Sequence, residues 1–185
     1  VARRVAQKLK AYCLPALPFS ISHMHRGSRG TVWLRNSTLA AVVRDIAASL
    51  QHDGFSQLVL LNGHGGNFIL VPIVQDLNLE FPKLLTMPLD AWIPVVTSGM
   101  FPQNASFLHA DEFETSCLLY LHKETVRKNR IQDQTKEPDR EMLRYLPFSK
   151  FSRLTHTGKP TRATAEKGER AVDCMVTHAV QSIQA

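Results

Sequence analysis

A histidine flanked by glycines follows one of the most apolar segments of the chain. His64 lies within NGHGGN at residues 62–67, directly after the apolar run 57–61. Glycine permits positive φ and lets a ligand approach the backbone closely, and an imidazole in that setting can bind a metal or move a proton. The alternative is a glycine turn with an incidental histidine. A nucleotide-binding loop is disfavoured, because the segment lacks both a Lys-Ser/Thr ending and GxGxxG spacing.

A second polar group, HADEFETS at residues 109–116, places one histidine and three acids where a helix is expected to begin. Asp111 as N-cap with Glu114 three residues later is a capping-box-like arrangement, and acids favour a helix N-terminus. These two residues are therefore as readily caps as ligands. The cap geometry requires neither His109 nor Glu112, and a hard or borderline divalent cation accepts histidine and carboxylate ligands.

The remaining histidines give weaker signals. His23 and His25 form a His-x-His pair in a loop, which is a mild indication of metal binding. Arg26 and Arg29 beside them could contact an anionic ligand, although surface hydration is the simpler explanation. The other four occur singly in helical or loop patterns, where solvated or core-edge positions explain them better: His52, His122, His156 and His178.

These motifs are positioned by alternating helices and strands. Helical spacing of apolar residues predicts helices over 1–12, 37–50, 68–79, from about 111, and 172–183. Apolar and β-branched runs predict strands at 31–34, 57–61 and 84–89. Loops are expected over 88–107 and 124–162. The order strand, glycine loop, helix, strand indicates a parallel sheet covered by helices, and ligands bind beyond the carboxyl ends of such strands, where NGHGGN lies.

Length and composition indicate one ordinary globular domain over residues 1–185. With 185 residues and 44% hydrophobic content the chain can bury a sizeable core. Its three cysteines lie far apart without a CxxC, which excludes a disulfide framework or zinc ribbon and is typical of a reducing cytoplasm. No apolar run reaches the roughly 20 residues of a membrane span and no signal peptide is evident, so a soluble cytoplasmic protein is expected.

The net charge of +6 is unevenly distributed. Residues 1–44 carry eight Lys and Arg and no acid, whereas residues 45–122 hold eight acids and one lysine. Basic ends can bind nucleic acid, but these show no interleaved aromatic residues and no nucleic-acid motif. Solvated surfaces explain them better, and both candidate metal-binding motifs lie in the acidic centre.

Four features in order make the chain resemble the creatininase (creatinine amidohydrolase) family. They are Gly30-Thr31 with Trp33-Leu34, NGHGGN at 62–67, HADEFETS at 109–116 and ATAEKG at 163–168. The resemblance implies an α/β fold with three layers, α/β/α, around a mostly parallel central sheet, and a homo-oligomer. It also implies two divalent metal ions per site, zinc, manganese or iron, which hydrolyse amide-type C–N bonds of small cyclic or formyl substrates.

The resemblance also implies roles for individual residues. His64 matches the family's metal-binding histidine, and His109 matches a histidine beside the substrate that can donate or accept a proton. Creatininases proper carry a glutamate ligand where this chain has Gly66, and an apolar residue where it has Glu112. We infer that Glu112 supplies the missing carboxylate from the other loop, with Glu114 as the alternative.

Three further residues are expected to contact the substrate. Trp92 resembles an aromatic residue of the family's substrate pocket, and Gly65 adjoins the metal-binding histidine. Asp111 stands where glycine usually follows His-Ala, which adds a charge beside the site.

Family members begin with a strand and a G-x-x-E-x-H-G loop that supply further ligands, and the sequence given begins after them. We therefore expect an N-terminally incomplete creatininase-like domain in which His64 and Glu112 are the ligands present. The predicted function is a metal-dependent amidohydrolase that uses a metal-activated water on C–N bonds other than peptide bonds. The alternative is a non-catalytic domain, lacking the N-terminal ligands, that serves binding or assembly.

Overall fold

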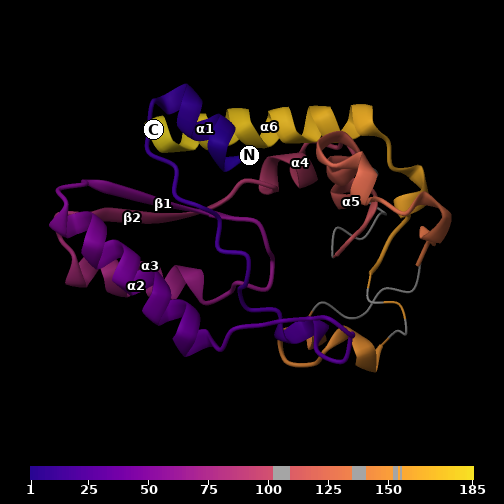
Figure 1. Ribbon diagram of the computed structural model, residues 1–185, viewed down its shortest axis with the longest axis horizontal. Helices are drawn as coiled ribbons and strands as arrows, with labels where there is room; N and C mark the ends of the chain where they lie inside the picture. Colours follow the sequence, from indigo (N-terminus) through magenta and orange to yellow (C-terminus); the bar gives the residue numbers. More distant parts are fainter. Residues whose placement is uncertain (102–108, 135–140, 152–153, 155) are drawn as a thin grey trace. The chain divides into compact units, whose positions relative to one another are not determined.

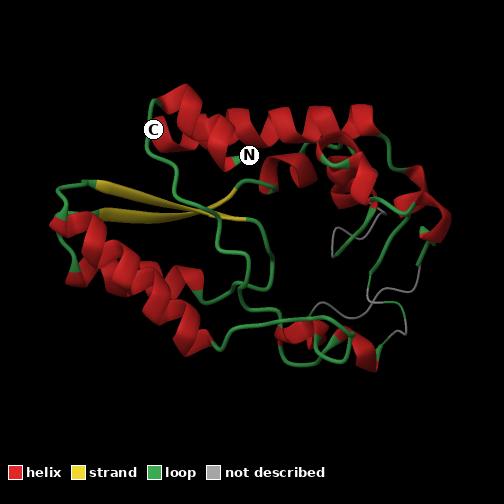
Figure 2. Cartoon of the chain, viewed as in Figure 1, coloured by secondary structure: helices red, strands yellow, loops and turns green. Residues whose placement is uncertain are grey.

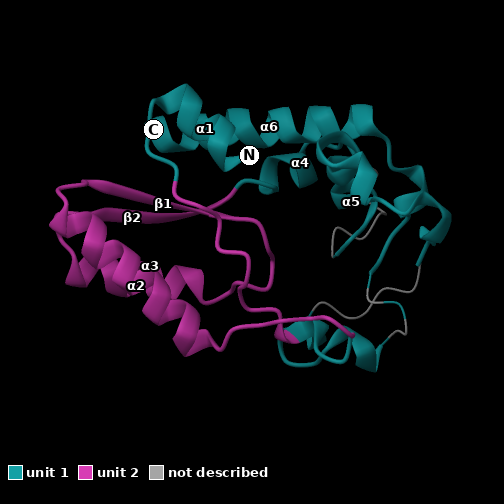
Figure 3. Cartoon of the chain, in the orientation of Figure 1, with its two compact units in different colours: residues 1–13, 24–28, 91–185 teal, residues 14–23, 29–90 magenta. Residues whose placement is uncertain are grey.

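The computed structural model describes residues 1–101, 109–134, 141–151, 154 and 156–185. Their contacts gather in two compact units (Figure 3), which we treat separately. One unit comprises residues 14–23 and 29–90, and the other comprises residues 1–13, 24–28 and 91–185. The single domain expected from the sequence stays a prediction.

The smaller unit contains the parallel strand pair that the sequence predicts (Figure 2). It follows the order α2 (Asn36–His52), β1 (Gln57–Asn62), α3 (Leu70–Glu80) and β2 (Leu85–Asp90). β1 pairs with β2 in parallel, from Gln57 opposite Leu85 to Asn62 opposite Asp90. The βαβ prediction is confirmed here, and both strands end at the same edge, where NGHGGN begins.

Helical spacing explains how this unit buries its core. Leu39, Val43 and Ala47 recur every four residues and form the buried face of α2. They join a cluster with the strands and α3, whose other buried members are Ile21, Leu58, Leu70, Ile73, Leu77 and Leu84. α2 ends at His52. Gly54, two residues later, has a φ of 83°, a left-handed conformation that is common just after a helix end.

The larger unit is helical. It contains α1 (Ala2–Leu9), α4 (Ile93–Thr97), α5 (Glu112–Leu121) and α6 (Ala165–Gln184). Single 3-10 turns lie at Lys123–Thr125, Lys128–Arg130, Met142–Arg144, Phe148–Lys150 and Pro160–Arg162, and a further turn, His23–His25, has its first residue in the smaller unit. α6 packs against α1, α4 and α5 (Figure 1) through a buried face that includes Ala171, Val172, Met175, Val176 and Ala179. None of the described helices has the length and apolar character needed to cross a membrane.

Two expectations for secondary structure are wrong, and one for surface exposure holds in part. The segment expected as a strand at 31–34 is irregular, with Val32 and Trp33 exposed. Its Leu34 amide donates to the Ser20 carbonyl oxygen, but the segment belongs to neither strand of the described sheet. The loop expected at 88–107 begins with the end of β2 and then forms α4, and its residues 102–107 lie outside the described residues. The surface excursion expected at 124–162 is exposed over most of its described residues, although Phe148 is buried.

Candidate active site

The NGHGGN loop is braced by its two asparagines. Asn62 Oδ1 accepts hydrogen bonds from the His64 amide at 3.1 Å and from Asn67 Nδ2 at 3.0 Å. Asn62 Nδ2 donates to Asp90 Oδ1 at 2.7 Å, across the end of the strand pair. Asn67 Oδ1 accepts from the Ile21 amide at 3.2 Å. The outer residues of the motif therefore fix the backbone that carries His64.

Gly66 provides space for the imidazole. A Cβ at Gly66 would lie 2.5 Å from His64 Nε2 and 3.0 Å from the Ile21 carbonyl oxygen, so the ring lies directly against this glycine. The positive φ that glycine permits is not used in this loop, since Gly63, Gly65 and Gly66 all lie outside that region. Among the three, only Gly66 is required to be glycine by its surroundings.

The environment of His64 favours its neutral form. The residue is half-buried, and burial lowers its pKa, while an interaction with the Ile21 backbone opposes that shift. A neutral imidazole is the form that ligates a metal ion. Gly65 beside it is exposed and its surroundings are open, which leaves room for a substrate.

In the other unit, Asp111 is the N-cap of α5. Its Oδ1 accepts from the amides of Phe113 at 2.9 Å and Glu114 at 3.2 Å. The Glu114 carboxylate in turn accepts from the amide of Ala110, a non-glycine residue with φ of 48°. The capping-box-like arrangement is confirmed. Burial raises the pKa of Asp111 to about 7, although these backbone amides stabilise its charged form.

His109 lies just before this cap, among aromatic rings and one carboxylate. Its Nδ1 is 3.9 Å from Glu114 Oε2. Its ring centroid lies 4.0 Å from that of His25, which is buried and stacks on Phe148 at 5.3 Å. The two histidines of the His-x-His pair therefore have different neighbours: the His25 ring contacts His109, whereas His23 contacts Trp33 in the smaller unit.

Glu112 is the most deeply buried carboxylate of the candidate set, with 1% of its surface exposed. Lys167 Nζ donates to its Oε1 at 2.5 Å and also to the carbonyl oxygen of Arg162 at 3.0 Å. Its Oε2 is buried and makes no hydrogen bond within the described residues. Lys167 is a residue that the sequence argument missed, although the ATAEKG motif contains it.

The ATAEKG segment brings α6 onto the first turn of α5. Thr164 caps α6 by accepting from the Lys167 amide at 3.2 Å, and its own amide donates to Ser116 Oγ at 3.2 Å. Ser116 Oγ also donates to the Glu112 carbonyl oxygen at 2.6 Å. Gly168 allows the close approach, since a Cβ there would lie 1.9 Å from the Ser116 carbonyl oxygen.

Trp92 directly precedes α4, as its N-cap residue. Its indole Nε1 is buried and has no hydrogen-bond partner within the described ranges. An indole N–H is a donor only, so this group fits an acceptor such as a substrate carbonyl.

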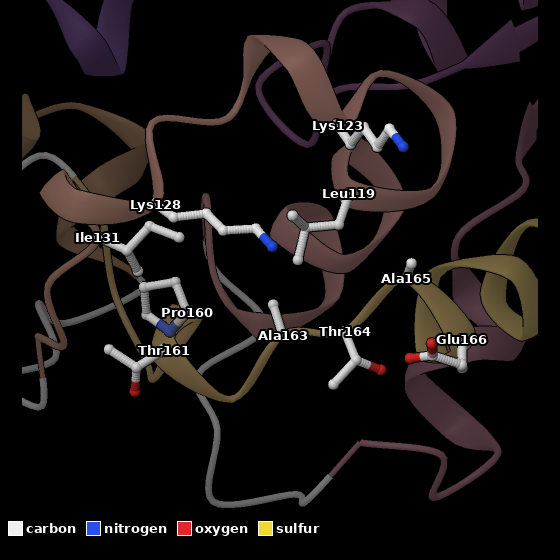
Figure 4. Close-up of a pocket in the computed structure, with 10 residues that line it drawn as sticks. All are labelled: Leu119, Lys123, Lys128, Ile131, Pro160, Thr161, Ala163, Thr164, Ala165 and Glu166. Carbon is white, nitrogen blue, oxygen red and sulfur yellow. The ribbon is translucent and has the colours of Figure 1, made fainter.

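A pocket of about 490 Å³ lies beside the C-terminal part of α5 and the segment that leads into α6 (Figure 4). Leu119, Lys123, Lys128 and Glu166 are among the residues that line it. None of the predicted site residues contributes to its lining, so it is separate from the candidate active site.

The two candidate ligands belong to different units, His64 to the smaller and Glu112 to the larger. Each fits a divalent cation in its chemistry, as a half-buried neutral imidazole and as a carboxylate with an open oxygen. Among the described residues, no three His, Cys, Asp or Glu side chains gather closely enough to hold a metal ion. The described part of the chain therefore contains individual candidate ligands without a complete set.

Comparison with known proteins relates these motifs to a family. The chain is 29% identical over 155 residues to the creatinine amidohydrolase of Pseudomonas putida, an alignment covering 72% of this chain and 58% of that protein. It is 29% identical over 197 residues to the mycofactocin precursor peptide peptidase of Mycobacterium tuberculosis, covering 99% of this chain and 73% of that one. A solved structure described as "Creatininase Mn" superposes with a TM-score of 0.82 at 25% identity, covering 98% of this chain and 78% of that chain.

This similarity confirms the α/β creatininase fold that the sequence predicts. The aligned part spans less than two thirds of the Pseudomonas relative. The family model for creatininase, described as creatinine amidohydrolase, matches residues 1–183, and the chain belongs to the creatininase family.

Proposed function

We propose that this chain belongs to a divalent-metal-dependent amidohydrolase that cleaves an amide-type C–N bond of a small substrate. The observation that carries the proposal is the first turn of α5, where His109 precedes a buried Glu112 whose Oε2 makes no hydrogen bond within the described residues. Family membership and the name of the Pseudomonas relative support the same reaction class.

In this proposal His64 and Glu112 are the ligands that the described residues supply. A divalent cation polarises a carbonyl and activates water for attack. His109 is the proposed proton donor to the departing nitrogen, and its Nδ1 lies 3.9 Å from Glu114 Oε2. Trp92, Gly65 and Asp111 are the proposed substrate contacts: the Trp92 Nε1 donor has no hydrogen-bond partner among the described residues, the surroundings of Gly65 are open, and Asp111 caps α5.

The finer parts of the proposal follow the family resemblance. We propose a small cyclic or formyl amide as substrate, two ions of zinc, manganese or iron per site, and a cytoplasmic homo-oligomer that uses no nucleic-acid partner. The similar solved structure described as a manganese form supports manganese. The Mycobacterium relative is named as a peptidase, so an assay must include a peptide amide as well.

The test is metal analysis combined with turnover. His64→Ala and Glu112→Gln are each expected to lose bound manganese relative to the unaltered chain, whereas His52→Ala, on an exposed helical position, retains it. Creatinine, an N-formyl amide and a short peptide amide then identify the substrate class. Unchanged metal content in both ligand variants would contradict the proposal.

The second candidate is a non-catalytic domain that serves binding or assembly. It is favoured by the ion pair of Glu112 with Lys167, which already compensates the buried carboxylate. Calorimetric binding of the same amides without any turnover, in the presence of manganese, would support this candidate over the enzyme.

A further inference from the structure

The buried carboxylate of Glu112 has a cation of its own. Lys167 Nζ lies 2.5 Å from Oε1, and the glutamate side chain is 2% exposed while the lysine side chain is 35% exposed. Isolating an ionised carboxylate from water costs several kcal/mol unless an opposite charge and hydrogen bonds compensate it. This pair therefore differs from the exposed pair Arg44–Glu80, which is worth little.

The position of Lys167 is fixed by its surroundings. Its amide donates to the capping hydroxyl of Thr164, and its Nζ makes a second bond to the Arg162 carbonyl oxygen. Gly168, the next residue, lets α6 contact the backbone at Ser116 directly. Since Ser116 Oγ bonds the Glu112 carbonyl oxygen, both partners of the ion pair are held by the same helix contact.

The lysine engages only one of the two carboxylate oxygens. Oε1 accepts from Lys167, and Oε2 is buried with no hydrogen bond in the part of the chain that the structure describes. A carboxylate can bind cations through both oxygens. A divalent ion on Oε2 would lie close to the ammonium group, and like charges at such distances repel each other strongly in a poorly hydrated site.

We propose that Lys167 is a built-in counter-ion of Glu112, which stabilises the buried carboxylate in the metal-free chain and weakens the binding of a divalent cation to its second oxygen. The second half of this statement rests on the proposed function, because it requires Glu112 to be a metal ligand. Lys167 is thus a positioning residue that determines how tightly the site holds its metal.

The test compares Lys167→Met, Glu112→Gln and the double variant in the full chain, with Arg44→Met as the control for loss of an exposed ion pair. In EDTA, Lys167→Met is expected to lower the Tm by on the order of 10 °C, because it leaves a buried charge without its partner. Adding Glu112→Gln should restore much of that loss, and Lys167→Arg should retain most of the stability. Arg44→Met should change the Tm little.

Manganese titration by calorimetry tests whether Lys167 weakens the binding of a divalent cation to Glu112. Lys167→Met is expected to bind Mn²⁺ roughly tenfold more tightly or better than the unaltered chain, because the repelling charge is gone. The tighter binding should disappear in the double variant. Affinity that is unchanged or weaker in Lys167→Met would overturn the claim that the lysine opposes the metal.

Two outcomes separate this inference from the proposed function. If the Tm losses of Lys167→Met and Glu112→Gln simply add in EDTA, the two residues are not coupled. The proposal that Lys167 is the counter-ion of Glu112 is then overturned, whatever the Mn²⁺ affinities are. If they are coupled but Glu112→Gln binds Mn²⁺ as well as the unaltered chain, Glu112 is not a ligand. The ligand assignment and the second half of the inference then fail, while the counter-ion itself stands.

Discussion

Gly168→Ala reverses the usual effect of adding a methyl group to a helix. Gly168 is in the first turns of α6, and alanine normally stabilises a helix interior over glycine by about 1 kcal/mol. In this structure the new Cβ would lie 1.9 Å from the Ser116 carbonyl oxygen and 2.4 Å from its carbonyl carbon. Both atoms are backbone, so no side-chain rotation can relieve the overlap.

The magnitude follows from the movement required. Restoring a contact of 3.4 Å means that α6 must withdraw from α5 by about 1.5 Å. That shift loosens the buried face around Ala171 and Val172 and weakens the bond of Thr164 to Ser116. Overpacking of this kind costs about 3 kcal/mol, which still leaves a net loss of about 2 kcal/mol after the gain in helix propensity.

Thermal unfolding of the metal-free chain measures the effect. A net loss of about 2 kcal/mol corresponds to a Tm lower by roughly 4–8 °C for a chain of this size. Thr177→Ala is the matched control, because this exposed position of α6 gains helix propensity without a new contact. An equal or higher Tm for Gly168→Ala would refute the close helix contact, and with it the reason given for this glycine.

Three further outcomes test the site and its surroundings. Gly66→Ala should weaken Mn²⁺ binding roughly tenfold or more in calorimetry because its Cβ displaces the His64 ring, whereas Gly65→Ala should bind as before. Alkylation followed by mass spectrometry should modify exposed Cys13 quickly at pH 8 and leave Cys117 intact, because burial raises the pKa of Cys117 to about 12; equal rates would contradict this. NMR titration should place the pKa of His64 below 6.5, because burial lowers it. As the pH drops below 6.5 the unfolded chain then binds this proton more readily than the folded chain, so the free energy of unfolding decreases. His64→Gln should lose this pH dependence.

Sequence periodicity was sufficient for the part of the fold that carries NGHGGN. The run 57–61 and the helical spacing after residue 68 predict β1 and α3 within one or two residues, because a short apolar run and a helical apolar period differ clearly in sequence. The segment 31–34 has the β-branched and aromatic residues typical of a strand but forms none. Strand formation needs a neighbouring backbone as well as a suitable composition, and composition alone does not reveal whether one is present.

For the NGHGGN loop, too, the sequence predicted some features and missed others. Sequence reasoning gives His64 as the candidate ligand of NGHGGN and assigns the glycines to backbone freedom and close approach of a ligand. The structure assigns the bracing to Asn62 and Asn67 and requires glycine only at Gly66, where the ring needs space. Such a steric requirement depends on the rotamer of His64 and on Ile21, which lies 43 residues earlier in the chain.

The acids of HADEFETS show why the sequence could not separate caps from ligands. A helix N-terminus stabilises any carboxylate nearby, so three acids in one turn have the same explanation until their hydrogen bonds are known. Asp111 accepts two backbone amides of α5 and Glu114 accepts the amide of Ala110, so helix capping accounts for both.

Glu112 takes no part in this capping. Its burial requires compensation from outside the helix, and the compensating charge comes from Lys167, 55 residues later in the chain. HADEFETS and ATAEKG therefore act together in the structure: the start of α6 packs against the first turn of α5, and its Lys167 is the cation that pairs with Glu112. Helix capping does not need the Glu112 carboxylate, and a lysine distant in sequence stabilises it. Among the acids of this turn, Glu112 is therefore the best candidate for a role in function.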